Sequence, residues 1–389
     1  MTKLTDDDVQ AIIARVKGRV AEVEGRTDVG GALAARAELH DIENRLGDGV
    51  HPTIDAAVAS ARRAQLRYRD AGLDARRVII EAIREAMRRE GERLAHLARE
   101  ETGIGRAADK VVKNRLVTDR TPGPEDLEPQ AVTGDEGMMV TEFAPYGVIG
   151  SITPTTNPTS TIINNTIAIL SAGNAVTFNV HPSAKDVSVE TVQVLNRAIV
   201  GAGGPADLVT TTPEPTLDSA RELMQHPDVA VLLVTGGPAV VGEALRTPKK
   251  AITAGPGNPP AVVDQTADVE QAGRDIVRGA SFDNNLICVD EKTTIVVDSV
   301  ADRLVQGMTI HGAYRLKEHE LRRLERVIFR ELGAPGRPGV MAAEWIGQDA
   351  GRMLTEIGVD HDPSVRLLVA EVPRDHSLVW TCLLYTSPS

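Results

Sequence analysis

The chain has 389 residues, a length that suggests two or three domains. Its 42% hydrophobic and 25% charged side chains are typical of a globular protein. Its net charge of -12 argues against a nucleic-acid partner, because phosphate binding needs clustered basic residues. Two cysteines make no disulfide framework and indicate a reducing cytoplasm. We expect no membrane span, no signal peptide and no metal site.

An amphipathic helix is expected over residues 1 to 24, because its apolar side chains recur at helical spacing. The residues on this face are Val9, Ile12, Ile13, Val16 and Val20. The glycine-containing stretch Gly25 to Gly31 is typical of a linker, so the helix is expected to be separable from the body, with residues 1 to 49 as helix and linker. The alternative is an N-terminal helix packed on its own domain.

Helices are predicted from Pro52 to Arg106, with a break near Gly72 and an end at Gly103 to Gly105. We interpret them as scaffold. The segment Thr121 to Gly137 is rich in proline, glycine and acids and is expected to be a surface connection, followed by a short strand over Met138 to Phe143.

From Gly147 onward, apolar strands alternate with helices. Strands are expected at Val148 to Ile152, Ala175 to Val180, Leu208 to Thr210 and Val229 to Val234, and helices from Pro158, from Ser183 to Val200, and after Gly237. This alternation predicts an α/β fold with a doubly wound parallel sheet. Such sheets bind ligands at the carboxyl ends of their strands.

A second unit is expected after Gly255 to Pro260. Its predicted elements are a strand at Ala261 to Asp264, a helix at Asp268 to Ala280, and strands at Thr293 to Asp298 and Val365 to Val372. Beyond Trp380 the sequence TCLLYTSPS resembles read-through from another frame, so we expect no role for Cys382.

Between the predicted helix and strand of this unit lies Ser281 to Lys292, with the sequence SFDNNLICVDEK. Asn284 and Asn285 favour a loop, and a polar loop can hold a thiol while leaving it accessible. Cys288 is therefore a candidate nucleophile, although a lone cysteine is more often a small buried hydrophobe. We interpret the acids and lysine that follow it as a solvated charge cluster.

Polar and glycine-rich segments follow the predicted strands, but no G-x-G-x-x-G fingerprint does. Thr235 to Pro238 could present backbone N–H groups to a phosphate, or simply form a tight turn. His181 to Ser183 occupies the equivalent position after another strand, and His181 alone would be a surface histidine. Asn157 before Pro158 fits either a helix N-cap or an amide donor to an oxyanion.

Taken together, the segments TPTTNP, HPSA, VTGGP, GPGNPP and FDNNLICVDEK resemble the aldehyde dehydrogenase superfamily from about Pro52 to Trp380. They are most similar to its CoA-acylating branch, the acetaldehyde and propionaldehyde dehydrogenases of bacterial microcompartments. The resemblance implies a Rossmann-like cofactor domain over 50 to 255, with part of an oligomerisation extension near 130 to 145. It implies a catalytic domain over 256 to 380, and leaves 381 to 389 as a foreign tail.

The resemblance also assigns residues. It makes Cys288 the nucleophile and Asn157 an oxyanion donor, although the hydrolytic family pattern places its asparagine one position earlier. The NAD site it implies consists of Thr153, Pro154, Thr155, His181, Pro182, Ser183, Thr235, Gly236, Gly237, Pro238 and Gly255.

The hydrolytic branch carries a water-activating glutamate where this chain has Ala254 to Asn258, without a carboxylate. The resemblance therefore implies that a short-chain aldehyde is oxidised with NAD to a Cys288 thioester, which coenzyme A removes as acyl-CoA in a reversible ping-pong cycle. The alternatives are a non-acylating aldehyde or semialdehyde dehydrogenase and an inactive nucleotide-binding or cargo protein. Because the family continues beyond Asp375, we expect residues 1 to 380 alone to be unstable or inactive and the full-length parent protein to be active.

By the same resemblance, Leu4 to Ala21 is similar to the encapsulation peptides that dock cargo on microcompartment shell proteins. The implied location is the cytoplasm or the inside of a bacterial microcompartment, and the implied assembly is a homo-oligomer.

Overall fold

The computed structural model describes residues 45–255 and 257–381. The amphipathic helix expected at residues 1 to 24, its docking role and Cys382 lie outside this range. The described residues divide into two compact units. The first contains 45–102, Val111–Gly236 and Val240–Ala254, and the second contains Gly103–Lys110, Gly237–Ala239 and the described residues from Gly255 onward.

Two long helices open the first unit, α3 (Ile54–Tyr68) and α4 (Leu73–Thr102). They confirm the predicted helical region and its break near Gly72. The hydroxyl of Thr53 begins α3 by accepting a hydrogen bond from the Ala56 N–H at 3.2 Å.

A third helix, α5 (Ala107–Arg120), follows, and the sequence did not predict it. Its buried side chains are polar, namely Lys110, Lys113, Asn114 and Thr118. A helix whose inner face is polar gives no apolar periodicity, which is the signal on which the prediction relied.

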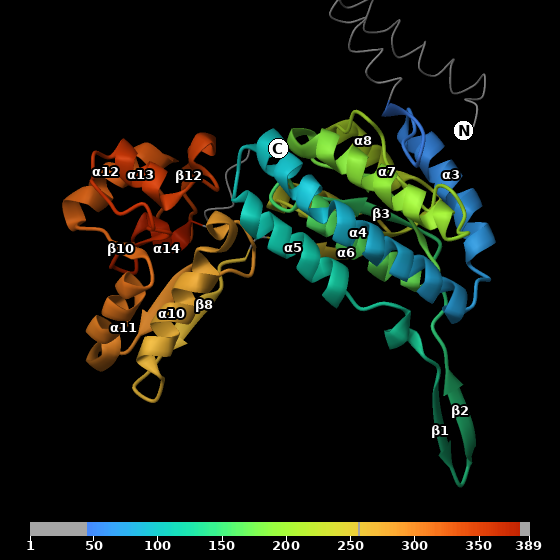
Figure 1. The fold of residues 1–389 in the computed structure, drawn as a ribbon, viewed down its shortest axis with the longest axis horizontal. Coiled ribbons are helices and arrows are strands. Elements are labelled where there is room, and N and C mark those ends of the chain that lie inside the picture. Colours follow the sequence, from blue (N-terminus) through green and yellow to red (C-terminus); the bar gives the residue numbers. More distant parts are fainter. Residues whose placement is uncertain (1–44, 256, 382–389) are drawn as a thin grey trace, which may run out of the picture. The chain divides into compact units, whose positions relative to one another are not determined.

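The connection expected at Thr121 to Gly137 contains a short helix, η1 (Pro124–Leu127), and a strand, β1 (Gln130–Gly134), so that prediction was incomplete. β1 pairs antiparallel with β2 (Gly137–Thr141), in register from Gln130 opposite Thr141 to Gly134 opposite Gly137. Every residue of both strands is exposed, and Figure 1 shows this hairpin projecting from its unit.

The predicted parallel sheet is present and has five strands in the order β5-β4-β3-β6-β7. The strands are β3 (Val148–Ile152), β4 (Ala175–Asn179), β5 (Val209–Thr210), β6 (Val229–Thr235) and β7 (Lys250–Ala254). Numbered along the chain, this order is 3-2-1-4-5, the Rossmann arrangement, whose switch point lies between β3 and β6. The doubly wound α/β prediction is therefore confirmed.

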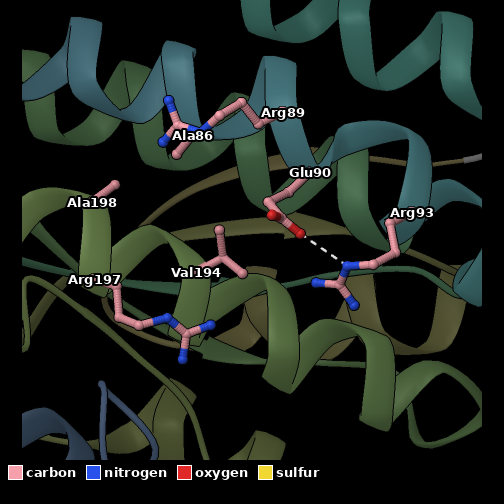
Figure 2. A pocket seen from close by; sticks show the side chains of 7 residues that line it. All are labelled: Ala86, Arg89, Glu90, Arg93, Val194, Arg197 and Ala198. Atoms are coloured by element: carbon pink, nitrogen blue, oxygen red, sulfur yellow. Dashed lines mark hydrogen bonds and ion pairs between the residues drawn. The ribbon is translucent and has the colours of Figure 1, made fainter.

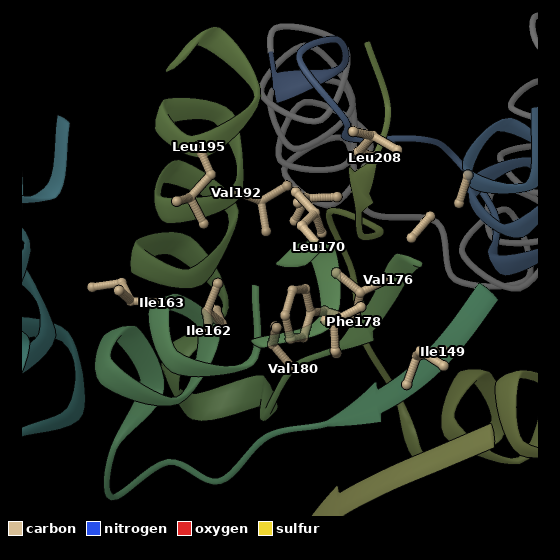
Figure 3. Close-up of a cluster of buried hydrophobic side chains, with 14 of the residues drawn as sticks. Ile149, Ile162, Ile163, Leu170, Val176, Phe178, Val180, Val192, Leu195 and Leu208 are labelled. Carbon is tan, nitrogen blue, oxygen red and sulfur yellow. The ribbon is translucent and has the colours of Figure 1, made fainter. Parts of the chain in front are cut away.

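Helices follow the strands as expected of right-handed crossovers. They are α6 (Pro158–Ser171), the short η2 (Pro182–Ala184), α7 (Lys185–Gly201), α8 (Leu217–Gln225) and α9 (Pro238–Arg246). α4 packs on α6 and α7, whereas α3 packs with α8 on the sheet. In Figure 3, the Phe178 ring of β4 lies near Ile162 and Leu170 of α6 and Val192 of α7, all of them fully buried.

The second unit contains parallel pairs and helices. β8 (Pro260–Val263) pairs with β9 (Thr293–Val296), and β10 (Ala313–Arg315) with β13 (Leu367–Val369). β11 (Phe329–Glu331) pairs antiparallel with β12 (Val340–Met341). The helices are α10 (Val269–Ala280), η3 (Phe282–Asn285), α11 (Asp298–Ile310), α12 (Glu318–Ile328), η4 (Ala343–Trp345), α13 (Ala350–Glu356) and α14 (Ser377–Trp380).

Candidate functional site

The carboxyl edge of the five-stranded sheet gathers the segments predicted to bind a nucleotide. Thr153 to Thr155 follows β3, His181 to Ser183 follows β4, and Thr235 to Pro238 spans the end of β6 and the start of α9. Gly255 directly follows β7. Because these strands are parallel neighbours, the sequence correctly predicted that the segments share one edge.

Thr153 is the residue at this edge whose surroundings best fit a ligand. Its side chain is buried, yet Oγ1 has no hydrogen-bond partner within the described part of the chain. A buried hydroxyl normally finds a partner, so an unmatched one beside the switch point is suited to a bound polar molecule.

Gly236 is placed where the chain turns from β6 toward α9. Its N–H donates to the Ala254 carbonyl at 3.1 Å, and an added Cβ would lie 2.7 Å from Val240 Cγ1. This close approach of backbone to helix explains one of the two glycines. It is also the kind of turn that brings a helix N-terminus to a phosphate.

The ring of His181 is turned onto its own backbone. Nδ1 accepts a hydrogen bond from the Ser183 N–H at 3.1 Å and thereby begins η2. Burial lowers the pKa of His181 from its ordinary value, so the neutral ring that can accept this bond is favoured. Pro182 and Ser183 are exposed.

Asn157 stands at the N-cap position of α6, with Pro158 at the first helical position, but its side chain makes no capping bond. Its Oδ1 instead accepts a hydrogen bond from Lys113 Nζ at 2.7 Å, and its Nδ2 donates to Thr156 Oγ1 at 2.9 Å. The N-cap interpretation is therefore right about position and wrong about the hydrogen bond.

Cys288 lies in the loop between η3 and β9, as predicted, and its side chain is half-buried. Three consecutive residues before it, Asp283, Asn284 and Asn285, have positive φ values of 46°, 57° and 62°. Asparagine and aspartate tolerate this left-handed conformation better than other side chains do. The left-handed turn before Cys288 therefore explains why these three positions are aspartate and asparagine.

The charged residues after Cys288 hold this loop, so the solvated-cluster interpretation was wrong. Lys292 Nζ donates to the carbonyls of Asn285 at 2.9 Å and Ile287 at 3.0 Å. Asp290 is buried, and its Oδ2 accepts from the Ile287 N–H at 3.2 Å. Both side chains bind the backbone directly before Cys288.

A buried ion pair supports the same loop from the start of α5. Lys110 Nζ lies 3.1 Å from Asp283 Oδ2, and Asp283 Oδ1 accepts from the Arg106 N–H at 2.7 Å. The Asp283 N–H in turn donates to Asp109 Oδ2 at 3.0 Å. These contacts could not be predicted from sequence, because their partners are separated by more than 170 residues.

Gly257 packs against the backbone of Cys288. A Cβ added at Gly257 would overlap the Cys288 carbonyl oxygen and lie 3.1 Å from its carbonyl carbon. Gly257 therefore reaches the loop that carries Cys288, and this close contact requires a residue without a side chain.

A separate groove between α4 and α7 collects arginines, as Figure 2 shows. Their charges are largely matched, since Arg93 pairs with Glu90 at 2.8 Å and Glu190 at 2.5 Å, and Arg197 pairs with Asp48 at 3.1 Å. None of the predicted site residues lines this groove.

The strand order, together with the polar segments at the carboxyl edge of the sheet, defines a Rossmann-type α/β protein of the kind that binds nucleotides. A family model described as the aldehyde dehydrogenase family matches residues 44–315. The chain belongs to the aldehyde dehydrogenase family.

Two relatives with assigned activities belong to one branch of this family. The chain is 45% identical over 334 residues to the acetaldehyde dehydrogenase (acetylating) EutE of Salmonella typhimurium, covering 86% of this chain and 71% of the relative. It is 43% identical over 330 residues to a propanal dehydrogenase (CoA-propanoylating) of Citrobacter freundii, covering 85% and 70%. The predicted resemblance to the CoA-acylating branch is confirmed.

Solved structures agree. A propionaldehyde dehydrogenase from the Clostridium phytofermentans fucose utilisation bacterial microcompartment matches with a TM-score of 0.82 and 39% identity, over 87% of this chain and 76% of that one. The Rhodopseudomonas palustris propionaldehyde dehydrogenase, solved with bound CoA and an acylated cysteine, matches with a TM-score of 0.82 and 42% identity, over 87% and 76%.

Proposed function

We propose that the protein, in its full-length form, oxidises a short-chain aldehyde to its acyl-CoA with NAD, by way of a thioester on Cys288. The observation that carries the proposal is the contact of Gly257 with Cys288. It places next to the nucleophile loop the segment in which hydrolytic relatives carry a glutamate, and here that segment has no carboxylate. The acyl group would therefore await a thiol and not water.

Cys288 acts as the nucleophile in this scheme. Its thiolate adds to the aldehyde carbon, forming a C–S bond while the carbonyl oxygen becomes negatively charged. We assign the Nδ2 of Asn157 and the Cys288 backbone N–H as donors to this oxygen. Lys292 and Asp290 bind the backbone of Asn285 and Ile287, directly before Cys288, so that the N–H and the thiol keep their relative orientation.

NAD, when bound, would supply the two-electron acceptor for the hydride that leaves the Cys288 adduct as it becomes a thioester. Of the eleven residues assigned to its site, those after β3 and β6 flank the switch point, and Thr153 Oγ1 offers an unmatched polar group there. His181 to Ser183 after β4 and Gly255 after β7 extend the same edge. With this assignment, residues 50 to 255 form the nucleotide-binding domain and 256 to 380 the catalytic domain.

The second half of the reaction returns Cys288 to its free form. The sulfur of CoA attacks the thioester carbon, the new C–S bond forms, and the Cys288 thiolate leaves. A CoA thiol is partly ionised near neutral pH and needs less help from a base than water does. The carboxylate of Asp290, close to Cys288 in the sequence, accepts a hydrogen bond from the Ile287 N–H and is thus engaged by the backbone.

Partners follow from the same comparisons and from one exposed element. The hairpin β1–β2 exposes Val132, Met138, Met139 and Val140, at 54% to 71%. A two-stranded hairpin with such side chains is marginal alone, so we assign it to contact with a second copy of this chain.

Among the described residues, no helix is long and apolar enough to span a membrane. We place the protein in the cytoplasm or inside a bacterial microcompartment.

The test is NADH formation from acetaldehyde or propionaldehyde, with and without CoA. The proposal expects sustained turnover only when CoA is present, and none for Cys288→Ala. Turnover that ignores CoA would instead indicate a non-acylating aldehyde dehydrogenase.

A further inference from the structure

Lys113 reaches from α5 to the candidate oxyanion donor. Its Nζ lies 2.7 Å from Asn157 Oδ1 and 3.4 Å from the Thr156 carbonyl oxygen, and the residue is only 6% exposed. We propose that Lys113 is a positioning residue, which holds the Asn157 amide so that its N–H side meets the substrate oxygen. The inference rests on the proposed function, because it gives a cause for the orientation of Asn157.

The two ends of an asparagine amide have nearly the same size, so sterics alone do not choose between them. An ammonium group has three donors and no acceptor, and it can therefore face only Oδ1. With Oδ1 held by Lys113, Nδ2 is turned the other way. Within the described part of the chain Nδ2 makes one hydrogen bond, to Thr156 Oγ1, which leaves its second N–H for a ligand.

Helix capping does not account for this asparagine. An N-cap side chain works by accepting a hydrogen bond from a backbone N–H of the first turn, and Asn157 makes no such bond. The oxygen that would accept it is bound by Lys113 instead. The residue type at the start of α6 is therefore explained better by the lysine contact than by the helix.

The effect on the reaction has a defined sign. If the amide turned over, Oδ1 would face the developing negative charge and destabilise it. The charge appears only in the transition state, so loss of Lys113 should lower kcat more than it changes KM. A hydrogen bond to a charged group is also stronger than a neutral one, which makes the orientation persistent.

The experiment is a double-mutant cycle in the full chain, with NADH formation from acetaldehyde at saturating CoA. Asn157→Ala should lower kcat by about 100-fold, the loss typical of removing one oxyanion donor. Lys113→Met should lower kcat by about 10-fold or more. The double variant should be no slower than Asn157→Ala, because the lysine acts only through the asparagine.

Lys249→Met is the matched control. Lys249 Nζ also donates to backbone carbonyls, those of His226 and Val229 at 2.7 Å each, but at the amino end of β6. Its kcat should equal that of the wild type. If Lys113→Met does not fold, Lys113→Gln keeps a donor without the charge and should have a kcat between those of the wild type and Asn157→Ala.

Three results separate the possible failures. A Lys113 variant with wild-type kcat, or losses that multiply in the double variant, would overturn the positioning role alone. A wild type that oxidises no aldehyde would instead contradict the proposed function, whereas an Asn157→Ala variant with unchanged kcat would overturn the oxyanion assignment of Asn157 and the inference with it. A similar loss of kcat in Lys249→Met would reduce Lys113 to a general structural contact and overturn the inference.

Discussion

Lys110 and Asp283 form an ion pair that is almost completely removed from solvent, with side chains 3% and 0% exposed and 3.1 Å between Nζ and Oδ2. The pair supports the loop that carries Cys288, and its acidic member, Asp283, has a φ of 46°. Breaking a buried pair is costly, because the remaining charge loses its partner in a medium of low polarity.

Asp283→Asn tests this support. Asparagine also tolerates positive φ, so the substitution changes the charge and little else. We expect the free energy of unfolding of the second unit to fall by about 3 kcal/mol, measured by urea denaturation. Asp302→Asn, on the exposed side of α11, should stay within about 0.5 kcal/mol of the wild type, and equal effects of the two substitutions would contradict the account.

Gly257→Ala tests the contact with Cys288. The added methyl group would overlap the Cys288 carbonyl oxygen, so the loop that carries Cys288 must shift. A displacement near 1 Å at a reacting group is enough for a loss of about 100-fold in kcat, measured by NADH formation. Gly72→Ala, where an added Cβ meets nothing within 4 Å, should leave kcat unchanged. An active Gly257→Ala enzyme would show that the loop does not depend on this contact.

Protonation of His181 should account for part of the loss of stability at acidic pH. Burial lowers its pKa in the folded state, so below about pH 6.5 the unfolded chain binds more protons than the folded one. Stability therefore falls as the pH drops, by at most about 1.4 kcal/mol per pH unit for this group. His181→Asn keeps an acceptor for the Ser183 N–H and should lose less stability than the wild type between pH 7 and pH 5, as measured by thermal melting. Identical pH profiles would argue against it.

Met139→Asp tests the hairpin as an oligomer contact. Met139 is 60% exposed, so a charge there should cost the isolated subunit little and should weaken an apolar interface. We expect a smaller assembly by light scattering. Val78→Asp, at an exposed apolar position on α4, should leave the assembly unchanged. A wild type that is already monomeric would contradict the assignment.

The sheet could be predicted from sequence because its strands are continuous apolar runs. Val148 to Ile152, for example, was expected as a strand and is β3 with the same bounds, buried at all five positions. Parallel pairing then placed the segments after β3, β4 and β6 at one edge without further information.

The supports of the site could not be predicted. Lys110 and Lys113 are buried by partners 173 and 44 residues away, and a lysine on a helix otherwise indicates a solvated face. Lys292 was misinterpreted for the same reason, since its role depends on where backbone carbonyls turn after three left-handed residues. Only the folded chain shows these contacts.

Cys288 should carry the acyl group until CoA removes it, and mass spectrometry can detect this intermediate. The enzyme is incubated with propionaldehyde and NAD without CoA, and the Cys288 peptide is analysed by mass spectrometry. We predict one propionyl group on Cys288, stable in buffer and lost on adding CoA with formation of propionyl-CoA. An unmodified Cys288, or a propionyl group that is lost to water as fast as to CoA, would contradict the account.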